Sequence, residues 1–178
     1  MIPDYTTIPG MFKDVVLSNP DKKLFNYKKN NQWLSLTGQE IYNTVESIAS
    51  ALRYYNLAKN DKVAILSTTS YKWALCDYGI LCNGSVTVTV YPTLIDKQIS
   101  YILNNSETQL IFVENQEQLS KINNVRSECL NLKKIILMDN SALENSQEIN
   151  FNDFIKIGSE NKSSDNFNFK EIIDSVDP

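Results

Sequence analysis

The sequence contains no histidine, and only three of its 178 residues are cysteine. Without an imidazole, the chain lacks the commonest metal ligand and the commonest general base at neutral pH. A Ser–His or Cys–His nucleophile therefore has no basis in these residues. The three thiols, Cys76, Cys82 and Cys129, are odd in number and spaced unlike any zinc or redox motif, so we expect buried free cysteines.

Long apolar runs and basic tracts are also missing. The most apolar stretch, residues 73–82, includes Asp77 and is far shorter than the roughly 20 residues that span a bilayer. The amino terminus lacks the charged start and apolar core of a secretory signal. A net charge of −4 and a pI of about 4.9 give no overall attraction to nucleic acid. We expect a cytoplasmic protein with no nucleic-acid partner. If the chain is part of a longer protein, that protein could still associate with the surface of a membrane.

The composition that is present suits one folded domain. Hydrophobic residues make up 42% of the chain and charged residues 21%, both ordinary values for a globular protein. Apolar residues at 24–27 and 33–36 flank a Lys-Lys-Asn-Asn segment, which predicts an antiparallel hairpin. Thr37-Gly-Gln-Glu40 matches a capping box, so a helix is expected to begin there. Its apolar positions recur every three or four residues up to Tyr55, forming one face to pack on a sheet.

From residue 61 onward, short apolar strands alternate with helices. Residues 61–67 contain an uninterrupted apolar run at 63–66, typical of a central parallel strand, and 86–90 alternate valine with threonine before Pro92 ends the strand. Further strands are predicted at 109–113 and 134–137. Helices are predicted from a cap in 68–70 to Cys82, from a cap at Thr93 to Asn104, and over 116–125. This order predicts an α/β fold, with a Rossmann-like, mainly parallel sheet and flanking helices behind the N-terminal β-hairpin.

Composition divides the chain into three parts. Residues 1–37 hold a lead-in helix and the hairpin, 38–138 the alternating α/β core, and 139–178 a polar tail and linker rich in Ser, Asn and Glu. In the tail, Phe151, Phe154, Ile155 and Ile157 predict one short helix, and residues 158–168 are expected to be mobile.

The turn Ser67–Ser70 is the local candidate for a ligand site. It joins a buried strand to a helix, where backbone amides and hydroxyls could cradle a phosphate at the positive end of the helix dipole. The turn contains no glycine, which hinders close approach of a phosphate, and hydroxyls at a helix start are usually caps. Capping is the stronger interpretation, with a phosphate site as its alternative.

Other candidate side chains each have an ordinary structural interpretation. The Tyr-Pro-Thr segment at 91–93 follows a strand where open α/β sheets bind ligands, yet it is by default a strand terminator. Trp33, Trp73 and Tyr78 could line a substrate pocket, but core packing is the stronger interpretation. Asp77 either faces solvent or, if buried, needs a polar partner. We therefore assign no catalytic, cofactor-binding or metal-binding residue.

Several segments follow a specific order, although each is degenerate alone. They are Trp33–Thr37, the helix up to Leu57, Asp61–Ile65, Trp73, Gly84, Tyr91–Thr93, Gln98–Leu103 and Asp174–Pro178. This order resembles the N-terminal part of adenylate-forming acyl-CoA synthetases of the AMP-binding superfamily, closest to long-chain fatty acid CoA ligases. Asn60 stands where that family usually has glycine, which affects only the local turn.

The resemblance implies a parent enzyme that activates a fatty acid with ATP and Mg²⁺, forms an acyl-adenylate and transfers the acyl group to coenzyme A. It also implies that the family's catalytic motifs lie beyond Pro178. Residues 1–178 would then be the N-terminal part of the large AMP-binding domain, truncated before the ATP phosphate loop. We expect an inactive scaffold that binds no cofactor itself, whose partner is the remainder of the ligase. An exposed apolar patch and self-association should follow.

Two alternatives remain at this point. The first is a flavodoxin-like domain that binds a phosphate or a flavin through Ser67–Ser70. The second is a stand-alone interaction module that shares the ligase front end without joining a catalytic domain.

Overall fold

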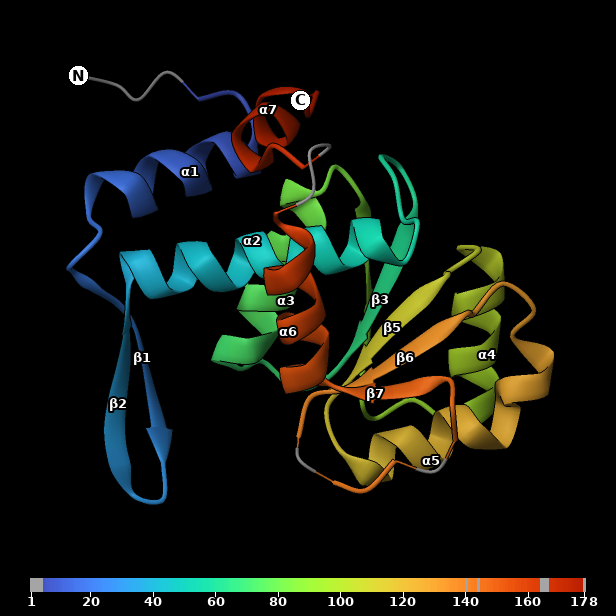
Figure 1. The fold of residues 1–178 in the computed structure, drawn as a ribbon. Helices are drawn as coiled ribbons and strands as arrows, with labels where there is room; N and C mark the ends of the chain where they lie inside the picture. The colour runs from blue at the N-terminus through green and yellow to red at the C-terminus, as the bar shows by residue number, and fades with distance from the viewer. Residues whose placement is uncertain (1–4, 140, 144, 164–166, 178) are drawn as a thin grey trace.

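The computed structural model describes residues 5–139, 141–143, 145–163 and 167–177 (Figure 1). It confirms the predicted fold class, with a hairpin followed by alternating strands and helices. In chain order, the elements are α1 (Ile8–Ser18), β1 (Lys23–Lys29), β2 (Gln32–Thr37), α2 (Gly38–Tyr54), β3 (Lys62–Leu66), α3 (Tyr71–Cys82), β4 (Val86–Val90), α4 (Asp96–Asn105), β5 (Leu110–Val113), α5 (Gln116–Val125), the 3₁₀ turn η1 (Arg126–Glu128), β6 (Lys134–Leu137), β7 (Glu148–Asn150), α6 (Phe151–Asn161) and α7 (Phe169–Asp174).

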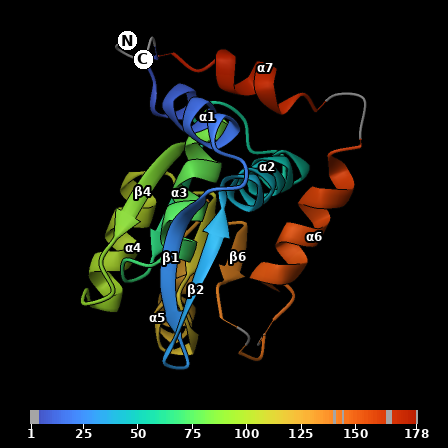
Figure 2. The ribbon, with the colours of Figure 1, turned by 90° about the vertical axis from the view of Figure 1, so that its left-hand side faces the viewer.

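A five-stranded parallel sheet forms the centre, in the order β4-β3-β5-β6-β7. Residues Val63–Leu66 of β3 are fully buried, as their uninterrupted apolar run predicts for a strand covered on both faces. One face packs against α2, α3 and α6, with α1 and α7 packed outside α2 and α3, and the other face packs against α4 and α5 (Figures 1 and 2). The sheet therefore has one hydrophobic core on each side.

The hairpin turns at Asn30 and Asn31, whose φ angles are 49° and 62°. Two positive φ angles are what a two-residue type I′ turn requires, and asparagine tolerates them better than most residues. The hairpin lies against α3, where Tyr27 stacks on Tyr71 with ring centroids 3.9 Å apart. The sequence thus encodes both the turn and the position of the hairpin.

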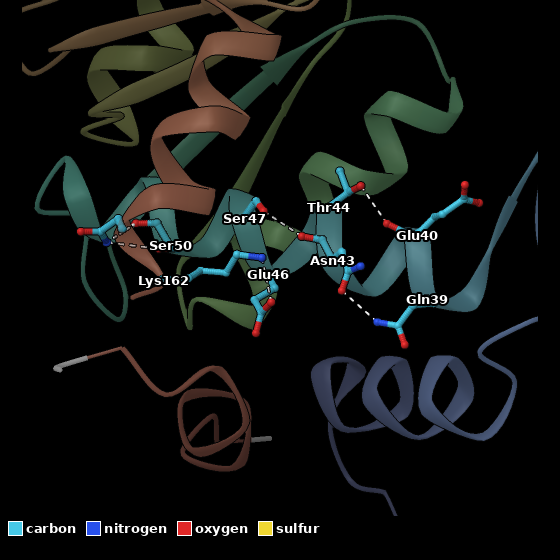
Figure 3. A network of polar contacts seen from close by, with 9 residues as sticks. Gln39, Glu40, Asn43, Thr44, Glu46, Ser47, Ser50 and Lys162 are labelled. Atoms are coloured by element: carbon cyan, nitrogen blue, oxygen red, sulfur yellow. Dashed lines mark hydrogen bonds and ion pairs between the residues drawn. The ribbon is translucent and has the colours of Figure 1, made fainter. Parts of the chain in front are cut away.

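Helix α2 begins with the predicted capping box at Thr37 and Glu40 and packs closely on α6. Gly158 of α6 makes this possible, because a Cβ there would lie 1.8 Å from the Ser47 carbonyl oxygen. Around this contact, Lys162 pairs with Glu46 at 2.9 Å (Figure 3). The polar contacts at the end of α6 thus fix it on α2.

The structure departs from the sequence expectations at four places within the described residues. Residues 158–161, expected to be mobile, belong to α6, whereas 164–166 lie outside the described residues. Strand β7 and helix α7 were not predicted at all. Helix α4 begins at Asp96 with Ile95 as its N-cap, so the cap predicted at Thr93 is wrong. Gln98 Oε1 accepts a hydrogen bond from the Ile95 amide at 3.3 Å, which is the half of a capping box that satisfies the amide of the N-cap residue.

Candidate functional site

The carboxyl ends of the parallel strands are where a ligand would be expected in an open α/β sheet. At this edge, Glu114 follows β5 and lies against the turn after β3. Its carboxylate accepts hydrogen bonds from the Thr68 amide at 2.8 Å and the Thr68 hydroxyl at 2.6 Å. A carboxylate of the chain thus takes the donors that a phosphate would need, and the turn does not fit a phosphate group. Sequence reasoning missed this role, since Glu114 and Thr68 lie 46 residues apart.

Two more hydroxyls of the turn, those of Ser67 and Ser70, also make hydrogen bonds within the chain. Ser70 caps α3 by accepting a hydrogen bond from the Trp73 amide at 3.2 Å. Ser67 donates to the Thr68 carbonyl oxygen at 2.8 Å. The capping interpretation is therefore confirmed for this turn.

The segment Tyr91–Thr93 crosses the end of β4 as a strand terminator. Lys121 of α5 donates to the Pro92 carbonyl oxygen, and to the Leu94 carbonyl oxygen at 3.4 Å. The Tyr91 side chain is 70% exposed. The segment is thus anchored through its backbone, while its aromatic ring projects from the molecule.

Lys72 is a half-buried cation at the same edge that sequence reasoning did not single out. Its Nζ donates to the Met138 carbonyl oxygen just after β6 and lies 5.3 Å from the centroid of the Phe151 ring. Burial lowers the pKa of Lys72. The ammonium group thus ties α3 to the end of β6 and the start of α6. A lysine in the largely apolar helix α3 was the available signal.

Asp77 of α3 is half-buried and has the polar partner that burial demands. The Thr87 hydroxyl on β4 donates to Asp77 Oδ1 at 2.7 Å. Burial raises the pKa of Asp77, and the hydrogen bond from Thr87 partly offsets that effect. Of the two interpretations left open, the paired carboxylate is the observed one.

The three aromatic candidates do not come together in one pocket. Trp73 and Tyr78 pack against the core, and Tyr78 contacts Phe12 with ring centroids 4.8 Å apart. Trp33 is 74% exposed, so the expectation that it packs in the core is wrong. It pairs with Lys28 in the two-stranded sheet, and both residues are exposed.

The three cysteines belong to the two hydrophobic cores. Cys76, Cys82 and Cys129 are buried and free, as predicted. Burial raises the pKa of all three, which disfavours the reactive thiolate.

Within the described ranges, no group of three His, Cys, Asp or Glu side chains is placed to hold a metal ion. No helix among the same residues has the length and apolarity needed to cross a membrane. At the carboxyl edge of the sheet, Glu114 and Lys72 hold the turn after β3 and the end of β6.

Curated relatives align with most of this chain but with a small part of themselves. The long-chain-fatty-acid–CoA ligase FadD15 of Mycobacterium bovis is 24% identical over 139 residues, which is 78% of this chain and 23% of the relative. The long-chain-fatty-acid–CoA ligase ACSBG2 of Xenopus laevis is 28% identical over 153 residues, 85% of this chain and 21% of the relative. The chain therefore spans less than a quarter of the length of these relatives.

A solved structure shares the fold. The crystal structure of the anthranilate CoA ligase AuaEII in complex with anthranoyl-AMP superposes with a TM-score of 0.72. The match covers 87% of this chain and 28% of that one, at 19% sequence identity. At this identity the likeness establishes the arrangement of strands and helices.

The family match extends over nearly the whole described chain. Residues 12–168 match the family described as AMP-binding enzyme, a range that begins within α1 and ends just before α7. It includes the hairpin, all five strands of the parallel sheet and helices α2 to α6. The chain belongs to the AMP-binding enzyme family.

Proposed function

We propose that this chain forms the front portion of a long-chain fatty acid CoA ligase and serves there as a scaffold. The observation that carries this proposal is the asymmetry of coverage. The chain aligns over 78% and 85% of its length with two such ligases, yet with only 23% and 21% of theirs. Family membership, shown by residues 12–168, supports the same assignment.

In the complete ligase, a fatty acid carboxylate would attack the α-phosphate of ATP and displace pyrophosphate to give the acyl-adenylate. The thiol of coenzyme A would then take the acyl group and release AMP. ATP, Mg²⁺, coenzyme A and the fatty acid would bind to the remainder of the polypeptide. The ligase would work in the cytoplasm, and any contact with a membrane surface would be made by that remainder.

The scaffold role is supported by how the carboxyl edge of the sheet is used. Glu114 holds the turn at Thr68, and Lys72 holds the end of β6. These interactions fix the turn after β3 and the first residue after β6, and they occupy the amide and hydroxyl of Thr68 and the carbonyl oxygen of Met138. The same observation removes support from a flavodoxin-like function, because a flavin phosphate would have to displace the Glu114 carboxylate.

The proposal is tested by assaying the pure 178-residue chain with ATP, Mg²⁺, palmitate and coenzyme A. We expect no acyl-CoA above a protein-free blank, with a complete long-chain fatty acid CoA ligase as positive control. Formation of acyl-CoA by the intact chain would overturn the scaffold function. Reading the coding sequence past codon 178 tests the parent assignment separately, since a stop codon there would favour a stand-alone module.

A further inference from the structure

The outer edge of β4 is uncharged and accessible. Among the described residues, β3 is the only strand that pairs with β4, which lies at the margin of the sheet (Figure 2). Its five residues are all valine or threonine, Val86 is 43% exposed, and Thr89 is exposed. Edge strands that avoid association are usually very short, charged, interrupted by proline or covered. Strand β4 has none of these protections.

The parallel ladder determines which backbone groups face outward. The Val86 amide donates to the Asp61 carbonyl oxygen at 2.9 Å, just before β3. Residues of a parallel strand face a given neighbour at every second position, so Val88 and Val90 also face β3. Thr87 and Thr89 therefore direct their backbone N–H and C=O groups away from the sheet.

We propose that a second copy of this chain pairs with this edge, the two β4 strands running antiparallel about a two-fold axis at Val88. In this register, Thr87 of each copy lies opposite Thr89 of the other. Directly opposed residues of that type exchange both N–H···O bonds in an antiparallel pair. The two-fold axis generates the pair twice, so each outward group of Thr87 and Thr89 gains a partner. The result is one continuous sheet across two molecules.

The same register places an exposed aromatic residue over a groove. Two positions further out, Tyr91 of each copy lies opposite Ser85 of the other. A groove of about 570 Å³ lies beside Ser85, bounded by Leu81 of α3 and Pro9 of α1. The Thr87 side chain points to the face of the sheet that α3 covers, where it bonds Asp77. Side chains at every second position of a strand share a face, so the Tyr91 ring, four residues later, lies on the face that holds the groove.

Tyr91 has the properties of an interface anchor. Its ring is 70% exposed and supplies apolar area, while its hydroxyl needs a polar partner when buried. At the groove, Lys59 and Asp177 form an ion pair at 2.6 Å that offers such partners. One sequence thus provides the donors, the acceptors, the anchor and the groove, which is what an isologous two-fold interface requires. This inference goes beyond the proposed function and does not depend on it.

Sedimentation of the pure 178-residue chain over a wide concentration range tests the pairing, and we expect a monomer–dimer equilibrium. Thr89→Pro deletes an outward amide, which an edge strand tolerates, and should raise the dimer dissociation constant roughly tenfold or more. Thr89→Val keeps the amide and should leave the constant nearly unchanged. Circular dichroism establishes that both variants are folded.

Tyr91→Ala gives an independent test that leaves the strand intact. If Thr89→Pro does not fold, this variant alone tests whether the dimer forms through the β4 edge. We expect roughly tenfold weaker dimerisation. Trp33→Ala is the matched control, because Trp33 is 74% exposed on the hairpin, away from β4. Hydrogen exchange should also show the amides of Thr87 and Thr89 gaining protection as concentration rises. A wild-type monomer throughout, or a dimer that neither Thr89→Pro nor Tyr91→Ala weakens, would overturn the proposal.

Discussion

The two edges of the parallel sheet differ in how the chain treats them. Strand β7 has three residues, Glu148 to Asn150, leads directly into α6 and is buried or half-buried. Strand β4 has five residues without a charge; its first residue, Val86, is exposed, and so is Tyr91, which follows its buried last residue, Val90. Both strands are parallel to their neighbours, so backbone pairing alone does not distinguish them.

The difference shows that the tail of the chain closes one edge and leaves the other. The Glu148 carboxylate accepts a hydrogen bond from the Asn145 side chain at 2.5 Å and one from the Asn123 side chain at 3.2 Å. These contacts tie the first residue of β7 to the preceding loop and to α5. We infer that the β7 edge contributes to folding stability, whereas the β4 edge is available for association.

The largest effect is expected where α6, which continues β7, packs on α2. Gly158→Val would force side-chain atoms into the Ser47 carbonyl oxygen, which already lies 1.8 Å from an ideal Cβ. Overpacking of this kind should lower the free energy of unfolding by about 3 kcal/mol. Urea denaturation measures it, with Ser159→Val on the exposed side of the same helix as control. An unchanged midpoint for Gly158→Val would show that α6 does not pack on α2 in this way.

Removal of the Glu148 side chain should have the next largest effect. Glu148 is 4% exposed, and Glu148→Ala would leave the side chains of Asn145 and Asn123 without this acceptor. We expect a loss of about 1–3 kcal/mol in the free energy of unfolding. Glu148→Gln keeps one acceptor oxygen and should lose less. Equal stability of Glu148→Ala and the wild type would contradict the closed state of the β7 edge.

On the β4 side, Asp77→Asn should stabilise the protein in a pH-dependent way. Burial raises the pKa of Asp77 above 3.8, so its ionisation costs stability once the pH exceeds that value. The cost is complete above the pKa in the folded protein and absent below 3.8. Asparagine keeps an oxygen that accepts from Thr87 and avoids the buried charge, so we expect a gain of less than about 1 kcal/mol at neutral pH.

Thermal unfolding from pH 3 to pH 7 is the measurement for Asp77→Asn, at roughly constant ionic strength. The advantage of the variant should vanish at the acid end. Asp14→Asn, an exposed carboxylate within α1, serves as control and should show no such trend. A stability loss at neutral pH would mean that the Asp77 charge supports the fold.

The smallest effect on stability is expected at the open edge itself. Thr89→Pro removes an amide that faces away from the sheet, so the monomer should lose less than about 1 kcal/mol. The control Val88→Pro removes an amide that faces β3 and should cost clearly more than Thr89→Pro, up to about 3 kcal/mol. Denaturation at a concentration below dimerisation compares the two. Equal losses would show that Thr89 is paired within the monomer and that the edge is not open.

Local signals in the sequence were sufficient for most of the elements. The bounds of α5 and β6 match the predicted ranges, and the capping box at Thr37 begins α2 as expected. In each case, a periodic apolar pattern or a capping residue is contained within the element. Buried strands and amphipathic helices are specified by such patterns because burial follows the same period.

Interactions between distant residues could not be predicted in this way. Strand β7 is too short to show a period, and α7 is held by contacts such as that of Phe169 with Tyr42. The role of Glu114 at Thr68 depends on two strands lying side by side. Trp33 was expected in the core because it is a large aromatic residue. Residue type gives no information on whether another element covers the hairpin. The domain boundaries at residues 37 and 138 stay a prediction.

The scaffold function is tested most directly by ATP–pyrophosphate exchange with the pure 178-residue chain. This assay isolates formation of the acyl-adenylate, so it detects partial chemistry that the overall reaction would miss. With palmitate, ATP and Mg²⁺, we predict exchange no faster than in a protein-free blank, because the described residues at the carboxyl edge are engaged in holding the fold. Exchange above the blank that depends on palmitate would contradict the scaffold function and place adenylation chemistry within these residues.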